Sequence, residues 1–392
     1  MLTPDSLETF QKALAEQGVD GWLLFDFRGV NPIAKELLRI QGMATRRQLA
    51  WIPVKGTPIA FMHVIEQGPW AHWPSQWQRE TYSSWKSLEA LLARYVANKR
   101  VAMEYSPGDA VPYLDRIPAG VLEMVRSTGA DVVSSGELVS RFYAVWSEHD
   151  VESHQRAAEV VAGIAREALA LAGRRAHAGH EITEHELMRW ILEQFRAHGL
   201  STDHGPNVSV GENAANPHYE PSPGHPRPIR VGEILLIDLW AREEGGVYAD
   251  QTWIASVGEP SAEAKRIWLA VRDARDRAIA IVRDASTRGT TLRGADVDDA
   301  ARSVIAERGY GSYFTHRTGH SIDARDLHGS GPHLDNLETR EERLLIPGVG
   351  FSIEPGVYVP GRIGMRSEVN VFLLPGEAVV TPKVYQTELI EV

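Results

Sequence analysis

Five residues in the C-terminal half of the chain are of the types that bind hard divalent metal ions. They are Asp238 in ILLIDLWA, Asp250 in VYADQTW, His320 in HRTGHSI, Glu354 in FSIEPGVY and Glu368 in GMRSEVNVF. Carboxylate oxygens suit Mn²⁺ best, and the single imidazole also allows Co²⁺, Fe²⁺ or Zn²⁺. Two such ions, roughly 3.5–4 Å apart, can hold a hydroxide between them and polarise a carbonyl group. The set therefore predicts a dinuclear site for hydrolysis.

The sequence around these residues indicates burial rather than exposure to solvent. Asp238 and Asp250 lie in two strand candidates joined by 242–246, which is typical of a hairpin turn that returns both side chains to neighbouring rungs. Asp238 stands within an apolar strand, where burying a carboxylate without a partner charge is expensive. Glu354 and Glu368 also stand in or beside apolar strands. Each acid alone has an ordinary interpretation as a solvated strand residue, but the five together favour a metal centre.

The elements that position these residues form two domains, because 392 residues exceed what one ordinary core holds. Helices and strands alternate over 1–147, and the strand candidates there are 22–27, 48–54, 58–64, 100–105 and 131–135. An alanine-rich helix over 150–178 marks the boundary. A second helix starts at Thr183, with Glu186 three residues on as a capping box.

Beyond residue 200 the pattern becomes rich in strands. Helices are predicted over 261–284 and 296–308, and the strand candidates include 350–359 and 379–392. We therefore predict an α+β protein with a small α/β domain over 1–147 and a larger domain over 148–392.

Composition and charge narrow the class of protein. The net charge of −11 argues against nucleic acid or an anionic membrane as the main partner. The chain has no cysteine, which excludes disulfides, thiolate metal sites and a cysteine nucleophile. Its start lacks the features of a signal peptide, and no apolar run approaches the length of a membrane span. A cytoplasmic enzyme is the expectation.

The five metal-ligand segments resemble the motifs of the pita-bread metallopeptidases, which include Xaa-Pro dipeptidase (prolidase), aminopeptidase P, methionine aminopeptidase and creatinase. The family pattern reads DxG, SDITR, GHGxG, EPGxY and RxEDxxxV, where this chain has DLWA, ADQTW, GHSID, SIEPGVY and RSEVNV. The resemblance covers about 150–392. The first domain is similar to the creatinase-type N-terminal domain in size and order of elements. The resemblance thus implies a pita-bread catalytic domain preceded by a smaller α/β domain.

The resemblance also implies a role for each ligand. Asp238 chelates one ion, Asp250 and Glu368 bridge both ions, and His320 and Glu354 complete the second. Glu354 further serves as general base toward water. Arg366 orients the carboxylate of Glu368 from behind the ligands, and Thr252 is the retained threonine of the SDITR motif.

Further candidates lie outside the ligand set. His218 and His328 match family histidines that hold the scissile carbonyl and stabilise the oxyanion, and both are assigned to catalysis and substrate binding. His316 is a candidate for substrate binding, and His333 is a further candidate. Tyr105 in the first domain could limit the length of the substrate. The ordinary interpretations are loop histidines and a core tyrosine.

The chain departs from the family pattern at three positions. Trp240 replaces a glycine, Trp253 replaces the arginine of SDITR, and Asp323 stands where a second glycine is expected after the metal-binding histidine. These changes affect the walls of the pocket more than the ligands. Asp323 and Asp326 could meet the ammonium group of a substrate, but their simpler interpretation is as solvated acids of a loop.

The resemblance implies hydrolysis of the Xaa-Pro bond in dipeptides, with two divalent ions per chain, a small peptide substrate and a homodimer. Two alternatives stay within enzymes: an aminopeptidase P that releases the first residue of longer Xaa-Pro peptides, and a creatinase-like C–N hydrolase. A different class is a non-catalytic binding protein on the same fold, or an acidic scaffold whose ligand residues are coincidental. Retention of all five ligands favours the peptidase.

Overall fold

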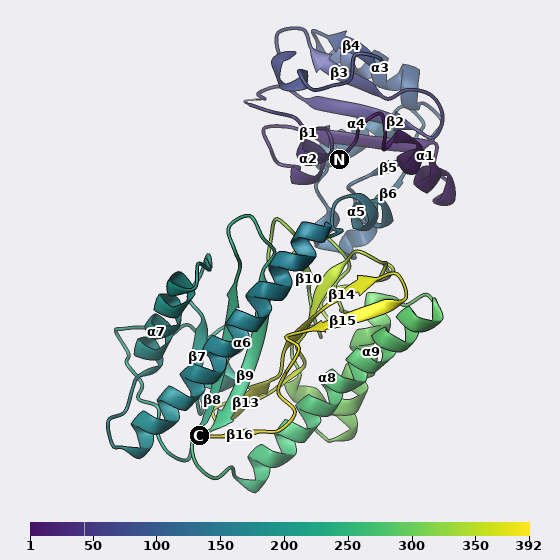
Figure 1. Cartoon of the computed structure of the whole chain (residues 1–392). Coiled ribbons are helices and arrows are strands. Elements are labelled where there is room, and N and C mark those ends of the chain that lie inside the picture. The colour runs from purple at the N-terminus through teal and green to yellow at the C-terminus, as the bar shows by residue number, and fades with distance from the viewer. Residues whose placement is uncertain (43) are drawn as a thin grey trace. The chain divides into compact units, whose positions relative to one another are not determined.

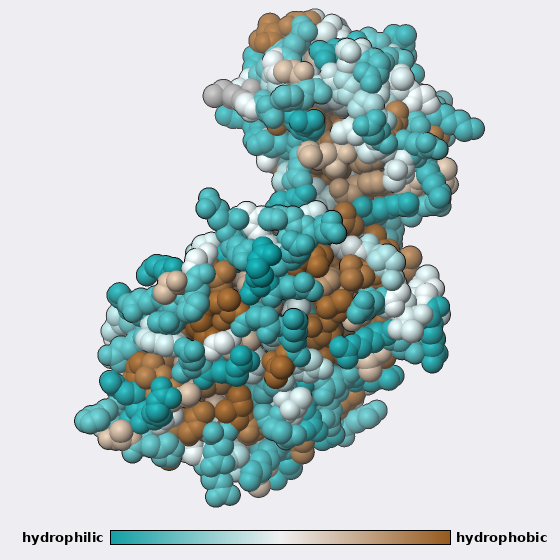
Figure 2. Space-filling model, viewed as in Figure 1, coloured by the Kyte–Doolittle hydropathy of each residue, from teal (hydrophilic) through white to brown (hydrophobic). Residues whose placement is uncertain are grey.

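A computed structural model describes residues 1–42 and 44–392, which fall into two compact units, Met1–Tyr143 and Ala144–Val392. This division comes a few residues before the expected boundary at 147/148. Hydrophilic residues cover much of the visible face of each unit, with hydrophobic residues between them (Figure 2). Within the described part of the chain, no helix combines the length and apolar character needed to span a bilayer.

The N-terminal unit is built on a six-stranded sheet with the order β4-β3-β2-β1-β5-β6 (Figure 1). Its strands are β1 (Gly21–Asp26), β2 (Gln48–Pro53), β3 (Ile59–His63), β4 (Gln78–Tyr82), β5 (Arg100–Met103) and β6 (Asp131–Ser134). Its α-helices are α1 (Leu7–Glu16), α2 (Pro32–Leu37), α3 (Trp85–Val96), α4 (Ala119–Arg126) and α5 (Gly136–Phe142). Successive residues of β1 enter different cores, with Trp22 in one and Leu23 in the other, because neighbouring strand residues point to opposite faces.

The C-terminal unit combines four long helices with two four-stranded sheets and a two-stranded ribbon (Figure 1). The helices are α6 (Glu148–His177), α7 (Glu184–Ala197), α8 (Ala262–Arg288) and α9 (Gly294–Glu307). The first sheet, in the order β16-β9-β8-β7, contains β7 (Asn207–Val210), β8 (Ile234–Ala241), β9 (Ala249–Ser256) and β16 (Ile390–Glu391). The second, in the order β10-β11-β14-β15, contains β10 (Ser321–Ile322), β11 (Gly350–Ile353), β14 (Val369–Leu374) and β15 (Glu377–Thr381). The ribbon pairs β12 (Gly356–Val359) with β13 (Ile363–Arg366).

The two faces of the β7–β8–β9 sheet have different neighbours. Leu235, Ile237 and Leu239 of β8 join the core formed with α6 and α7, whereas Leu236 joins the core formed with α8 and α9. Asp238 shares the parity of Leu236, so it lies on the face turned away from α6 and α7. The sheet thereby presents its carboxylates toward the second sheet.

Two sequence predictions about local structure have clear outcomes. The capping box of α7 is confirmed, because Glu186 accepts from the backbone of Thr183 at 2.8 Å and Thr183 accepts from that of Glu186 at 3.2 Å. The predicted strand over 379–392 is wrong in its middle, where neither β15 nor β16 extends over 382–389. Pro382 offers no backbone donor. The side-chain amide of Gln386 bonds instead to both the N–H and the carbonyl of Ile254, at 3.0 and 2.8 Å.

Candidate metal centre

The hairpin of β8 and β9 brings the two aspartates together, as the sequence predicts. In its register Asp238 faces Thr252, and Trp240 faces Asp250. Residues two apart on a strand point to the same face, so Asp238 and Asp250 are diagonal neighbours on one surface. Asp250 and the rest of β9 are buried, whereas Asp238 of β8 is half-buried, so little bulk water reaches the two carboxylates.

The second sheet brings the other three predicted ligands to the same place. Glu354 directly follows β11, and Glu368 directly precedes β14. Because Ile353 pairs with Val369 in that ladder, the two glutamates lie at the same end of neighbouring strands. His320 directly precedes β10, whose residue Ser321 pairs with Phe351 of β11. The predicted ligands therefore come from within β8 and β9 of one sheet and from the ends of β10, β11 and β14 of the other.

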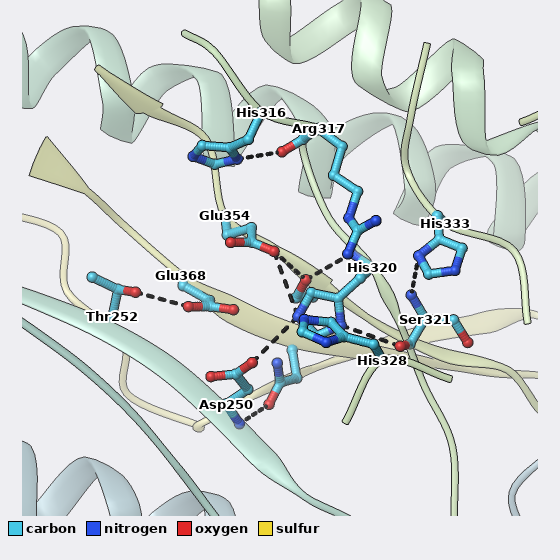
Figure 3. Close-up of polar contacts among 12 residues, drawn as sticks. Asp250, Thr252, His316, Arg317, His320, Ser321, His328, His333, Glu354 and Glu368 are labelled. Atoms are coloured by element: carbon cyan, nitrogen blue, oxygen red, sulfur yellow. Dashed lines mark hydrogen bonds and ion pairs between the residues drawn. The ribbon is translucent and has the colours of Figure 1, made fainter. Parts of the chain in front are cut away.

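The side chains of these residues converge around His320 (Figure 3). Its Nε2 lies 3.3 Å from Oδ2 of Asp250 and 3.5 Å from Oε1 of Glu354. Ligand atoms of Asp250, His320 and Glu368 all lie within 4.8 Å of one another, which makes these buried residues a group able to hold a metal ion. Asp238 is outside this group of three and is joined to the others through Arg366.

Arg366 is buried among the carboxylates. Its Nη2 forms an ion pair with Oδ2 of Asp238, and its Nε donates to Oγ1 of Thr252 at 2.8 Å. Its guanidinium is farther from Glu354 and Glu368, at 3.8 and 3.9 Å. Arg366 was expected to orient Glu368, but its closest carboxylate partner is Asp238. Thr252 is the residue that donates to Glu368, at 2.7 Å from Oε2.

Burial and mutual repulsion control the charge of this centre. Burial raises the pKa of Asp238 to about 6, although Arg366 opposes the shift. Burial and then the neighbouring Glu354 raise the pKa of Asp250 to about 8, and burial with Asp250 raises that of Glu368 far above its usual range. For Glu354, burial also acts upward, but His320 and Arg366 outweigh it and the pKa falls. The guanidinium groups of Arg366 and Arg317 thus balance the charge of the four carboxylates incompletely.

The residues present fit a bound divalent cation. Oδ1 of Asp250 and Oε1 of Glu368 are buried and have no hydrogen-bond partner among the described residues. Buried polar atoms of folded proteins are normally satisfied, so such oxygens indicate a ligand of another kind. Carboxylate oxygens with one imidazole nitrogen are suitable donors for Mn²⁺, Co²⁺ or Zn²⁺.

Of the other predicted site residues, His328 and His316 lie beside the ligands. The ring of His328 stacks edge-on against His320 with centroids 4.3 Å apart, and His320 together with burial lowers its pKa to about 3. Burial lowers the pKa of His316 to about 4. Both ring nitrogens of His316 are engaged, at 2.7 Å from the carbonyl of Arg317 and 2.8 Å from the hydroxyl of Tyr358. His316 would have to release Tyr358 to bind a substrate through Nε2.

The remaining candidates are placed as follows. His218 is exposed in the loop after β7, where its backbone N–H bonds to Asn216 at 3.1 Å. His333 is fully buried, and its Nδ1 accepts from the backbone of Ser321 at 3.2 Å. Tyr105 lies half-buried in the N-terminal unit under the guanidinium of Arg126, 5.0 Å from the ring centroid. Their functional roles remain predictions.

The three departures from the family pattern have distinct structural settings. Trp240 lies on the ligand-bearing face of β8, and its Nε1 donates to Asp203 at 2.9 Å. Trp253 is buried on the opposite face, in the core with α6 and α7. The interpretation of Asp323 as a solvated acid is wrong, because it is 1% exposed and accepts from the backbones of Arg325, Asp326 and Ser330 at 2.8–3.0 Å.

Two buried acids that support the site were not found from the sequence. Asp298 of α9 accepts from the backbone of Thr318 at 3.0 Å and pairs with Arg302, which donates to the carbonyl of His316 at 2.9 Å. Glu184, the first residue of α7, binds the loop that carries His218 through Tyr219 at 2.6 Å. From the sequence, a single acid near a helix terminus cannot be distinguished from a solvent-exposed one. The one relevant signal was the capping pattern at Thr183, which indicated an ordered start of α7.

The chain belongs to metallopeptidase family M24, whose model matches residues 152–374. It is 33% identical over 211 residues to the probable dipeptidase PepE of Mycobacterium tuberculosis, a match that covers 51% of this chain and 52% of that protein. The chain thus spans about half the length of the curated relatives it matches. The predicted pita-bread α+β fold agrees with this family. It also agrees with the order of the two units, in which the smaller one precedes the larger one that carries the family match.

Two solved structures share the fold over nearly the whole chain. The dipeptidase PepE from Mycobacterium ulcerans superimposes with a TM-score of 0.73 at 24% identity, covering 99% of this chain and 97% of that one. A dipeptidase from Pyrococcus horikoshii OT3 gives a TM-score of 0.65 at 27% identity, covering 98% and 99%. Both comparisons include the N-terminal unit, which the family match does not reach.

Proposed function

We propose that the protein is a dinuclear metallopeptidase that hydrolyses the Xaa-Pro bond of dipeptides. The observation that carries this proposal is the convergence of Asp250, His320 and Glu368, with ligand atoms within 4.8 Å, beside the carboxylates of Glu354 and Asp238. The dipeptidases among the relatives support the substrate length, and the resemblance to prolidases supports the proline. Asp238, Asp250, His320, Glu354 and Glu368 would hold two divalent ions, with Mn²⁺ the preferred metal.

When bound, two divalent ions would polarise a carbonyl group and lower the pKa of water. Glu354 would accept the proton from the attacking water, because the lowered pKa of Glu354 keeps its carboxylate ionised at neutral pH. Thr252 and Arg366 would keep the carboxylates of Glu368 and Asp238 in place through the bonds they already make.

The histidines would act on the substrate carbonyl. The lowered pKa of His328 makes it a neutral imidazole at neutral pH, and no described hydrogen bond uses its ring nitrogens. It could therefore donate to the oxyanion that forms at the scissile carbonyl. His218 would do the same from the loop after β7. A small peptide as substrate and a homodimer as assembly belong to this proposal.

The test is removal and return of the metal on a panel of peptides. Purified protein should contain about two divalent ions per chain and lose activity by about 100-fold or more after chelation. Mn²⁺, Co²⁺ or Zn²⁺ is then added back separately, with Xaa-Pro dipeptides and Xaa-Pro-Xaa tripeptides as substrates. Full activity of metal-free protein would refute the proposal. Cleavage of tripeptides alone would instead identify an aminopeptidase P, and cleavage of neither would favour the binding protein.

A further inference from the structure

Asn207 of β7 lies next to a predicted metal ligand. In the β7–β8 ladder Asn207 is directly opposite Asp238, and directly opposite residues project from the same face of a sheet. Asn207 is only 7% exposed. It therefore belongs to the buried surface that carries the carboxylates, one strand farther from Asp250.

The orientation of the Asn207 amide is fixed by its surroundings. Nδ2 lies 3.3 Å from the carbonyl oxygen of Pro217, an acceptor that only the NH₂ end of the amide can satisfy. Oδ1 therefore points away from that carbonyl. It is buried and has no hydrogen-bond partner among the described residues, and the same is true of Oγ of Ser209, two residues along the same strand. A buried acceptor without a donor costs free energy and is rare, which indicates a donor from outside the protein.

The loop that contains Pro217 is held firmly enough to prevent the amide from turning over. Glu184 accepts from the hydroxyl of Tyr219 at 2.6 Å and from Nδ2 of Asn213 at 3.0 and 3.1 Å. The same carboxylate accepts from the backbone of Val210 at 2.7 Å, which ties the loop to the end of β7. Asn207 and Glu184 thus fix the loop from two sides.

We propose that Asn207 binds substrate, with Oδ1 accepting a hydrogen bond from the free α-ammonium group of a short peptide. A positively charged donor is favoured over a neutral one, because a hydrogen bond from an ionised donor is the stronger of the two and offsets more of the cost of burying Oδ1. This role rests on the proposed peptidase function and makes an unblocked amino terminus part of substrate recognition. The loop that carries His218 would then have a second role, because Pro217 in the same loop orients the amide of Asn207.

The experiment compares Ala-Pro with propionyl-proline, which has the same shape but no amino group. On the Mn²⁺-loaded full chain, kcat and KM are measured for each compound that is hydrolysed, and a dissociation constant is measured by calorimetry for each compound that is not. In the unaltered protein Ala-Pro should bind about 10-fold or more tightly than propionyl-proline. Asn207→Leu, which has a similar shape without polar atoms, should remove most of that preference by weakening Ala-Pro alone.

Tyr219→Phe is the matched control, because it loosens the loop through Glu184 while leaving the Asn207 amide intact. It should affect both compounds alike. If Asn207→Leu weakens both compounds equally, or neither, the contact with the ammonium group is refuted. A third substrate, Ser-Pro, tests whether the donor to Asn207 is instead a side-chain hydroxyl of the substrate. If Asn207→Leu loses a preference for Ser-Pro over Ala-Pro but keeps the preference for Ala-Pro over propionyl-proline, the donor is the hydroxyl and the proposal is overturned.

Failure of the proposed function is distinguishable from failure of this inference. If the unaltered protein cleaves no peptide, the peptidase proposal fails, while the binding constants still decide the role of Asn207. Metal content is measured for every variant, and it should remain at the level of the unaltered protein because Asn207 is not a predicted ligand.

Discussion

Each of the two units buries carboxylates, but in opposite ways. Glu104 of the N-terminal unit is fully buried and accepts from Nε1 of Trp22 at 2.5 Å, Nδ2 of Asn31 at 2.8 Å and Oγ of Ser135 at 3.1 Å. In the C-terminal unit, Asp250 and Glu368 each keep one buried oxygen without a hydrogen-bond partner among the described residues. Neutral donors surround the first acid, whereas other acids surround the second pair.

The difference separates a structural carboxylate from a ligand. Three hydrogen bonds replace the water that Glu104 loses on burial, so the fold alone explains its position. The carboxylates of the metal centre repel one another, and Arg366 compensates only part of their charge. A fold retains such an arrangement when a cation stabilises it. Replacing an acid by its isosteric amide should therefore abolish activity at the metal centre and leave activity unchanged at Glu104.

The largest effect is expected for Asp250→Asn. The amide has the same shape but removes a predicted bridging oxygen, so kcat/KM for Ala-Pro should fall by about 10³-fold or more. In metal-free protein at pH 8, the same change removes a source of repulsion and should raise the unfolding midpoint by a few degrees. Activity assays, metal analysis and thermal unfolding check these outcomes. A fully active variant would show that Asp250 bridges nothing.

A smaller effect is expected for Thr252→Val, which keeps the shape of the side chain but deletes its hydroxyl. Glu368 then loses its donor and Nε of Arg366 loses its acceptor. Metal affinity should fall by about 10–100-fold, with less change in kcat at saturating Mn²⁺. Titration with Mn²⁺ followed by activity measures both quantities. Thr252→Ser retains the hydroxyl and should behave almost like the unaltered protein; equal loss in both variants would indicate a packing effect.

The ligand set could be predicted from the sequence because its members stand within apolar strands and recognisable motifs. The hairpin of β8 and β9 was also predictable, since Gly245 and Gly246 mark the turn between two apolar runs. The supporting residues were not. Glu184 and Asp298 are single acids on helices, and nothing local distinguishes a buried acid there from a solvated one. Their partners, Tyr219 and Thr318, lie 20 or more residues away.

Short or polar elements were missed for a different physical reason. β4 is an edge strand whose first four residues, Gln78-Arg79-Glu80-Thr81, are polar, so it lacks the alternation that reveals a half-buried strand. α2 has only six residues and begins at Pro32. The reverse error occurs over 382–389, which was predicted as strand. There the side-chain amide of Gln386, in place of a backbone amide, bonds to Ile254 of β9.

Asp323 represents a third manner of burying a carboxylate, because its donors are backbone N–H groups. Oδ1 accepts from Arg325 and Asp326, and Oδ2 accepts from Ser330, which closes the loop that carries His328. Asp323→Asn places an NH₂ group against the N–H of Ser330 or those of the other two residues. We expect kcat/KM to fall by about 10-fold with unchanged metal content. Loss of metal together with activity would mean that the loop supports the ligands instead of His328.

The smallest effect on catalysis, and the clearest test of the comparison, is expected for Glu104→Gln. Burial raises the pKa of Glu104 to about 7, against the opposing hydrogen bonds from Trp22, Asn31 and Ser135. The folded state then holds the proton more tightly than the unfolded state does. The stability contributed by Glu104 is therefore complete below about pH 4.5 and is lost as the pH rises through 7, by up to about 3 kcal/mol. Guanidinium unfolding between pH 5 and pH 8 should show this decline in the unaltered chain and less of it in Glu104→Gln, with kcat/KM unchanged within about two-fold.

Parallel pH profiles of stability for the two proteins would mean that Glu104 is already ionised in the fold. A loss of activity in Glu104→Gln like that of Asp250→Asn would remove the distinction between the two sites.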